Sequence, residues 1–205
     1  VDPIAKISSL KVSKSIPSFL TKVEMERLLD YKEYPPTFEG ERDKMILEMF
    51  YSTGIRLSEL INIKLTDIDY DAKQLKIFGK RSKERIIPLL NNHLESLKLY
   101  VQNYRIKERS TCTNLFISKS GNVLYPKLVY RMVNAYLSKV TGVKQKSPHV
   151  LRHAFATHML NDGADLNAVK DVLGHASLTS TQIYTHNTAE QLKKVYKQAH
   201  PRGDK

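Results

Sequence analysis

Apolar side chains recur at the three- to four-residue spacing of an α-helix along most of this 205-residue chain. The clearest case is a helix predicted over residues 42–52, where four large residues share one face: Met45, Ile46, Met49 and Phe50. Gly54 follows it as a C-terminal cap. Thr21 and Glu24 have the spacing of a capping box, which predicts an earlier helix that begins near residue 22. The same periodicity predicts further helices over these ranges: 57–64, 91–106, 126–140 (with Gly142 as its cap), 149–160, 165–173, 177–184 and 188–198.

Three short stretches are typical of β-strands instead. LKIF at 75–78 and RIIPL at 85–89 flank the polar sequence GKRSKE, which predicts a β-hairpin with a basic tip. LFIS at 115–118 is also strand-like. Residues 1–18 are rich in Lys, Ser and Pro and are interpreted as a linker. The predicted fold is therefore mainly α with a small antiparallel β-sheet or hairpin, an α+β architecture.

The charge of the chain indicates a class of partner. Its formal net charge is +12 at pH 7, and such an excess favours polyanions, of which nucleic acid is the commonest. A soluble domain that happens to be basic is the alternative. The single cysteine, Cys112, excludes an internal disulfide and fits a reducing cytosol. The sequence shows neither a secretion signal nor an apolar run of membrane-spanning length, so a cytoplasmic protein without a membrane partner is expected.

Two basic motifs lie in the first half of the chain. Arg56, in TGIRLSEL, stands at the start of a short helix and can pair with Glu59 three residues later. Taken alone, this pair is better explained as a surface salt bridge. The hairpin tip fits either a solvated turn or a loop along a phosphate backbone, and it carries four cations within six residues: Lys80, Arg81, Lys83 and Arg85.

Two histidine-containing motifs lie in the second half. His149 and Arg152, in SPHVLRH, are three residues apart on one predicted helix and can point at one target. His149 and His153 also have the spacing of a zinc pair, but the glutamate of such pairs is absent and Arg152 would stand beside the metal, so no metal is expected. His153 and His158 are interpreted as structural. In LGHASLTSTQIYTH, Tyr184 follows His175 by nine residues, and core packing of Tyr184 is favoured when this stretch is read alone.

The four motifs together supply what cleavage of a DNA strand without a metal requires. Two guanidinium groups can hold the non-bridging oxygens of the attacked phosphate. A tyrosine is neutral at pH 7, because its ordinary pKa is about 10, and a nearby imidazole can accept its proton. A lysine can then donate a proton to the leaving 5′-oxygen.

These motifs resemble those of the tyrosine site-specific recombinases of the phage integrase family, and most of all the bacterial Xer recombinases. The resemblance spans nearly the whole chain. It is carried by TGIRLSEL (53–60), GKRSKERIIPL (79–89), SPHVLRHAFATHML (147–160), NDGADLNAVKDVLGHASLTSTQIYTH (161–186) and HPR (200–202). It implies the catalytic-domain fold of that family and a metal- and ATP-independent DNA strand transferase that needs no cofactor.

The resemblance also implies roles for single residues. Arg56 and Arg152 would clamp the scissile phosphate, and His175 would donate a hydrogen bond to it. His149 would act as general base or acid. Tyr184 would attack and form a 3′-phosphotyrosyl link.

Other roles follow from the same resemblance. Lys80 would protonate the leaving oxygen, although Arg81 stands where the family has glycine, so Lys83 remains an alternative acid. Glu59 would support the basic residues of the site. DNA contacts are expected from the hairpin cations Arg81, Lys83 and Arg85, and from the helix at 126–140 through Lys127 and Arg131.

The domain organisation implied is an interdomain linker remnant at 1–18, a catalytic domain at 19–186, and a C-terminal helix and tail at 187–205. Relatives exchange this helix between protomers, and packing within one protomer is the alternative here. An N-terminal core-binding domain is expected outside this chain.

The expected partners are a double-stranded recombination site and a tetramer of this protein or a paralogue, in a bacterial cytoplasm and associated with the nucleoid. The tail would suit a contact with a DNA translocase. Chromosome dimer resolution is the favoured role. The alternatives are an integrase of a mobile element, a type IB topoisomerase and a non-catalytic DNA-binding module.

Overall fold

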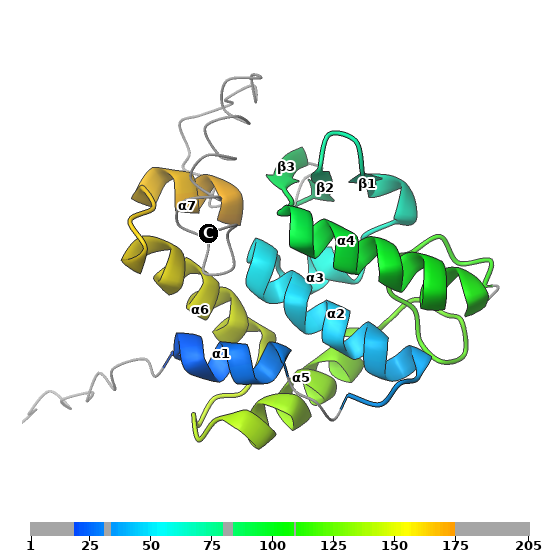
Figure 1. Cartoon of the computed structure of the whole chain (residues 1–205), viewed down its shortest axis with the longest axis horizontal. Coiled ribbons are helices and arrows are strands. Elements are labelled where there is room, and N and C mark those ends of the chain that lie inside the picture. The colour runs from blue at the N-terminus through cyan, green and yellow to red at the C-terminus, as the bar shows by residue number, and fades with distance from the viewer. Residues whose placement is uncertain (1–18, 31–33, 80–83, 109, 175–205) are drawn as a thin grey trace, which may run out of the picture.

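The computed structural model describes residues 19–30, 34–79, 84–108 and 110–174 (Figure 1). The chain begins with two helices, α1 (Lys22–Leu29) and the long α2 (Phe38–Thr53), and the single turn α3 (Leu57–Leu60). After the turn η1 (Leu65–Asp67) come three strands: β1 (Ile68–Asp69), β2 (Gln74–Phe78) and β3 (Glu84–Pro88). Helix α4 (Asn91–Tyr100) continues into the π-helical turn η3 (Val101–Arg105) and the turn η4 (Ile106–Glu108). The last described helices are α5 (Pro126–Val140), α6 (Pro148–Asn161) and α7 (Leu166–Leu173).

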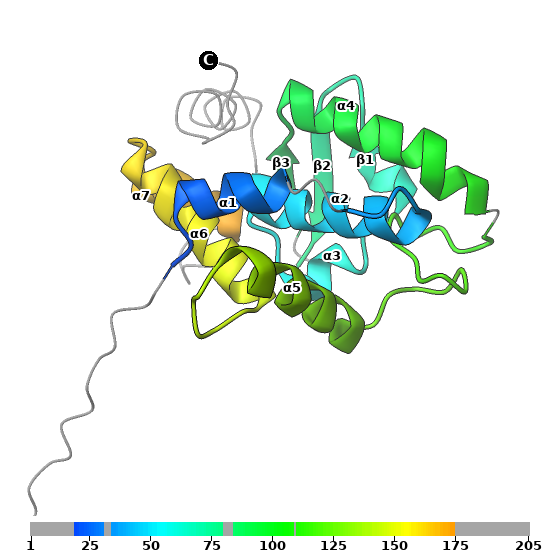
Figure 2. The same ribbon diagram turned by 60° about the horizontal axis from the view of Figure 1, so that its bottom comes forward.

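Helix α2 lies at the centre of this arrangement. It packs against α6 on one side and against α4 on the other, and α1 also contacts it (Figures 1 and 2). Within the described residues the strands form an antiparallel sheet in the order β1-β2-β3, in which Leu75 pairs with Ile87 and Ile77 with Arg85. Strand β3 contacts α7, and α7 in turn contacts α6. The end of α7 is therefore brought next to the hairpin.

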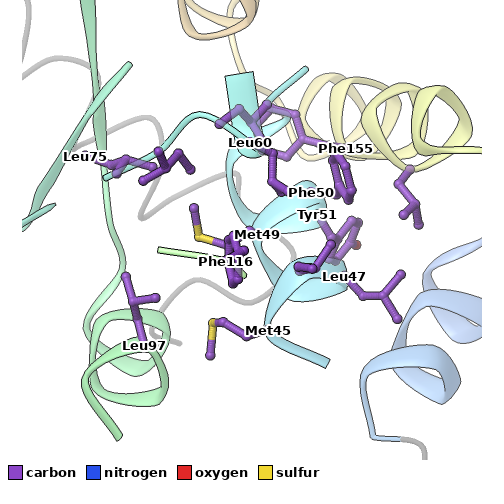
Figure 3. Close-up of a cluster of buried hydrophobic side chains, with 14 of the residues drawn as sticks. Met45, Leu47, Met49, Phe50, Tyr51, Leu60, Leu75, Leu97, Phe116 and Phe155 are labelled. Atoms are coloured by element: carbon purple, nitrogen blue, oxygen red, sulfur yellow. The ribbon is translucent and has the colours of Figure 1, made fainter. Parts of the chain in front are cut away.

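The hydrophobic core surrounds α2 and draws residues from almost every element. Phe50 of α2, Phe155 of α6 and Phe116 have no exposed surface (Figure 3). Full burial of such a side chain contributes roughly 1.5–3 kcal/mol. The burial extends to the end of α2, where Thr53 is covered completely. The segment that follows α2 therefore begins within the packed core.

Local signals in the sequence placed several elements correctly. The capping box forms: Thr21 Oγ1 accepts from the Glu24 amide at 3.2 Å, and Glu24 accepts from the Thr21 amide at 2.8 Å. Gly54 ends α2 in the left-handed conformation, with φ 59°. The hairpin and the helix at 126–140 are confirmed, whereas α2 begins at Phe38, earlier than predicted.

Three predictions were wrong, and in each case the segment makes contacts that its own sequence does not indicate. The helix predicted at 57–64 ends at Leu60, since the amide of Leu65 donates to Thr113 (3.0 Å) and Ile63 accepts from the amide of Leu115 (2.8 Å). LFIS forms no regular strand; within it only Ile117 takes part in an isolated bridge, with Val123. Gly142 is not the cap of α5: Thr141 ends the helix in an extended conformation, and its hydroxyl donates to Glu24 at 2.6 Å.

The predicted helices at 177–184 and 188–198 lie outside the described residues. Of the helices that the structure does describe, none is long and apolar enough to cross a membrane.

Candidate active site

Three arginines converge on the C-terminal end of α7. The carbonyl of Val172 accepts from Nε of Arg85 at 3.0 Å, and that of Gly174 from the guanidinium of Arg56 at 2.9 Å. The Leu173 carbonyl between them accepts from Arg152 at 2.7 Å. The last carbonyls of a helix have no partner within the helix and carry partial negative charge. Three guanidinium groups compensate that charge here.

The three arginines reach this point from separate elements. Arg56 is the N-cap of α3, Arg152 lies in the second turn of α6, and Arg85 belongs to β3. Gly54 brings two of these elements together, because its carbonyl accepts from Arg152 and its left-handed turn leads into Arg56. A Cβ at Gly54 would overlap Phe155 Cδ1 of α6 and would stand 2.7 Å from Leu173 Cδ2 of α7, so the close approach of both helices to the end of α2 requires glycine.

Glu59 is the anion at the centre of the cluster. Its Oε1 accepts from Arg56 (2.9 Å) and from Arg85 (2.8 Å). Its Oε2 accepts from the Arg56 amide (2.9 Å) and from the second nitrogen of Arg85 (2.8 Å). Burial alone would raise the pKa of Glu59, but the hydrogen bonds and charge of Arg85, and then the bonds from Arg56, lower it to about 2. Glu59 is therefore a carboxylate at neutral pH.

Arg85 lies inside the protein and not among the exposed cations of the hairpin tip, where we expected it to contact DNA. Only 6% of its surface is exposed, and its guanidinium forms a two-pronged pair with Glu59. Strand alternation explains the difference: Arg85 and Ile87 point to the buried side of the hairpin, whereas Glu84 and Ile86 face solvent. The prediction of a DNA contact for Arg85 is therefore corrected.

The cluster as a whole has the charge and the hydrogen-bond donors to accommodate an anion. Three guanidinium groups against the single carboxylate of Glu59 leave an excess of positive charge. Burial, together with the charge of Arg56, lowers the pKa of Arg152 to about 10, so Arg152 is still a cation at pH 7. The side chain of Arg56 is 34% exposed, so the positive charge is accessible from solvent. A phosphate group matches Arg56 and Arg152 in charge and in hydrogen-bonding geometry.

The histidines of α6 differ in their surroundings. His149 is exposed in the first turn, three residues before Arg152. His158 is buried, and its Nδ1 lies 2.9 Å from the Tyr51 hydroxyl, as its structural interpretation requires; burial lowers its pKa. His153 is exposed, with its ring edge-on to Phe19. In the described part of the chain, His, Cys, Asp and Glu form no group of three that could hold a metal ion.

Several predicted site residues lie outside the described part of the chain. Lys80, Arg81 and Lys83 fall between Gly79 and Glu84, and His175 and Tyr184 follow Gly174, all outside the described residues. Lys127 and Arg131 are described, and both are exposed on α5, where Arg131 donates to the Tyr125 hydroxyl at 3.0 Å. The structure thus brings Arg56, Glu59 and Arg152 together.

Comparison with known proteins gives a consistent result. The model of the phage integrase family matches residues 18–191. The tyrosine recombinase XerC of Staphylococcus epidermidis is 40% identical over 205 residues, which are all of this chain and 69% of that protein. The XerC of Chlorobaculum parvum is 38% identical over 220 residues, which cover 97% of this chain and 66% of the relative.

Solved structures show the same likeness. The crystal structure of the XerA recombinase has a TM-score of 0.70 at 31% identity, over 92% of this chain and 67% of that one. The XerH site-specific recombinase, solved with a palindromic difH substrate as a post-cleavage complex, has a TM-score of 0.71 at 27% identity. That match covers 93% of this chain and 56% of XerH.

Proposed function

This chain belongs to the phage integrase family, and from that premise we propose that it cleaves and rejoins DNA at a specific site through a 3′-phosphotyrosyl link. The observation that carries the proposal is the convergence of Arg56 and Arg152 on the end of α7, directly before the segment that contains His175 and Tyr184. Gly174, which caps the end of α7, precedes the proposed nucleophile Tyr184 by ten residues.

The arginines bind and polarise the scissile phosphate. A guanidinium group carries five N–H donors in a planar fork, so an arginine that donates to a carbonyl of α7 can also donate to a phosphate oxygen. The phosphate gains negative charge in the transition state, and fixed cations stabilise that charge without reorganisation. Arg56 is held in this orientation by Glu59 and Arg152 by Gly54.

The remaining roles complete a transesterification. The Tyr184 oxygen forms a bond to phosphorus and gives up its proton to His149, which is exposed on the same helix as Arg152. The bond from phosphorus to the 5′-oxygen breaks, and Lys80 donates a proton to that oxygen; Lys83 is the alternative donor. His175 donates a hydrogen bond to the phosphate. Since the link to tyrosine keeps a phosphate diester, rejoining requires neither ATP nor a metal.

Trapping the covalent link tests this function. The protein first selects its site from a pool of random duplexes. The selected duplex is then made with a nick beside the scissile phosphate, so that cleavage releases the short fragment between the nick and the cleavage point. That fragment diffuses away, and the covalent link to the protein cannot be reversed. Denaturing gels should show a protein–DNA adduct in EDTA. Tyr184→Phe should abolish the adduct, and Tyr130→Phe, a change at an exposed tyrosine of α5, should not.

The outcomes of this assay separate the alternatives. An adduct that persists in Tyr184→Phe would show that another residue is the nucleophile. Dependence on magnesium would exclude the mechanism. Selection of a site without any adduct would indicate a non-catalytic DNA-binding module, and relaxation of supercoils without a preferred site would indicate a topoisomerase.

The biological role that we propose is Xer-like resolution of chromosome dimers in the bacterial cytoplasm, at the nucleoid. The 40% identity to a XerC supports this role over integration of a mobile element. It predicts a tetramer on DNA, assembled from this protein or with a paralogue, with the helix at 188–198 docked on a neighbouring protomer and a translocase at the tail. Deletion of the gene should leave cells with dimeric chromosomes, and an unchanged chromosome population would favour the mobile-element role.

A further inference from the structure

We infer that Arg85 is a positioning residue for the phosphate clamp, which acts on Arg56 through Glu59. This inference rests on the proposed function, and it assigns to a buried arginine of β3 a part in the cleavage step. Arg85 touches neither the phosphate nor the nucleophile in this scheme. Its effect is to fix the carboxylate that orients Arg56.

The hydrogen bonds around Glu59 carry the inference. Each carboxylate oxygen accepts one bond from Arg85 and one from Arg56, at 2.8 to 2.9 Å. Rotation of the carboxylate would lengthen bonds to both arginines together. Both carboxylate oxygens accept from the Arg85 guanidinium on the buried side, so Arg85 sets the plane of the carboxylate. That plane sets the direction of the partly exposed Arg56 guanidinium.

Arg85 also joins the clamp to two other parts of the site. Its Nε donates to the carbonyl of Val172, so β3 is tied to the end of α7. Along the chain it stands two residues after Lys83, and thus next to the loop that carries the proposed acid. One side chain therefore connects the hairpin, α3 and the last turn of α7.

A role in stability alone would explain the buried pair of Arg85 and Glu59 poorly. A buried ion pair contributes little net stability, because desolvation offsets most of its attraction, and apolar residues of similar volume often serve as well. Accurate placement of a catalytic group has a larger effect on rate, since misplacement by about 1 Å can slow a reaction roughly 100-fold. The pair is thus better accounted for by the orientation of Arg56.

The test compares Arg85→Met with Arg105→Met in the adduct assay. Arg105 is an equally buried arginine, 2% exposed, whose guanidinium donates to the carbonyls of Cys112 and Asn114. Both variants lose a buried guanidinium, so both should unfold at a lower temperature than the wild type. Only Arg85→Met should cleave slowly, with a rate constant at saturating DNA that is roughly 10- to 100-fold lower. Its affinity for uncleaved DNA should stay within about threefold, since the contacts with the rest of the duplex remain.

A second readout reports on the clamp itself. A substrate with a methylphosphonate at the scissile position lacks one charged oxygen, so a well-placed clamp discriminates strongly against it. Arg85→Met should reduce the ratio of phosphate to methylphosphonate cleavage by about tenfold, and Arg105→Met should leave the ratio unchanged. Arg85→Lys is measured in parallel, because it keeps the positive charge and loses the two-pronged hydrogen bonding of the guanidinium. It should behave like Arg85→Met, and it replaces that variant if Arg85→Met does not fold.

Each result has a defined meaning. Wild-type cleavage by folded Arg85→Met or Arg85→Lys overturns the inference, and so does slow cleavage with an unchanged methylphosphonate ratio or a loss confined to DNA affinity. In all of these cases the wild-type adduct still supports the proposed function. Absence of an adduct from the wild type overturns the proposed function, and the inference with it.

Discussion

Stability should depend on pH through Glu59, and the size of the effect follows from its environment. The folded protein lowers the pKa of this carboxyl from 4.5 to about 2, although only 4% of the side chain is exposed. At about 1.4 kcal/mol per pKa unit, folding favours the ionised form of Glu59 over its protonated form by about 3 kcal/mol. The source is the set of hydrogen bonds and the charge of Arg85, and then the bonds from Arg56, which together outweigh the cost of burial.

The direction of the pH effect is determined by which state holds the proton more tightly. The unfolded chain binds a proton on Glu59 near pH 4.5, and the folded protein only near pH 2. The stabilisation is therefore fully present above pH 5 and is lost as the pH falls toward 2. Between pH 7 and pH 3 the loss from this residue alone should be about 2 kcal/mol.

Urea unfolding followed by circular dichroism measures this loss. The free energy of unfolding is determined at pH 7, 5 and 3 for the wild type and for Glu59→Gln, and each protein is compared with its own value at pH 7. The other carboxyl groups titrate in both proteins, so the difference between the two isolates Glu59. The wild type should lose about 2 kcal/mol more than the variant from pH 7 to pH 3, and almost none of this difference should arise above pH 5. Equal losses in the two proteins would refute the ion-pair reasoning.

Three further predictions concern the elements around the site. Gly54→Ala should lower the free energy of unfolding by about 2–4 kcal/mol, because it combines a left-handed backbone with a clash. Gly163→Ala, with φ 88° and open space around it, should cost only about 1–2 kcal/mol in the same urea titration, and equal costs would contradict the close approach. Asp165→Ala removes the side chain that accepts from the first amides of α7 and should cost about 1 kcal/mol by thermal unfolding; no change would mean that this cap contributes nothing. Lys127→Ala should weaken binding to the selected duplex more than to an unrelated one, and equal losses in filter binding would assign Lys127 to phosphate contact.

The sequence alone predicted those features that depend on neighbours a few residues away. The capping box of Thr21 and Glu24, the helix end at Gly54 and the pair of Arg56 with Glu59 all involve residues within four positions of each other or the periodicity of one helix. Such interactions form in any tertiary context that permits the helix, so the spacing of residue types is sufficient to find them.

Features that depend on partners far away in the sequence could not be predicted from the sequence alone. The helix at 57–64 was predicted too long, since nothing in those residues indicates that residues 113–115 will take up their backbone groups. Arg85 was assigned to the basic tip because it follows three other cations, and only its register against Ile77 shows which side of the sheet it occupies.

The cluster of Arg56, Arg85, Arg152 and Glu59 at the end of α7 is the clearest case of a feature that only the tertiary structure determined. Arg56 meets the carbonyl of Gly174 across 118 residues of sequence, and Arg152 meets that of Gly54 across 98. The sequence contained both arginines, Glu59 and the motifs that indicate their family. Their orientation arises only when α2, α6 and α7 pack together and the unpaired carbonyls at the end of α7 require donors. Residue types thus determined the chemistry available to this protein, and packing decided which groups face the same point in space.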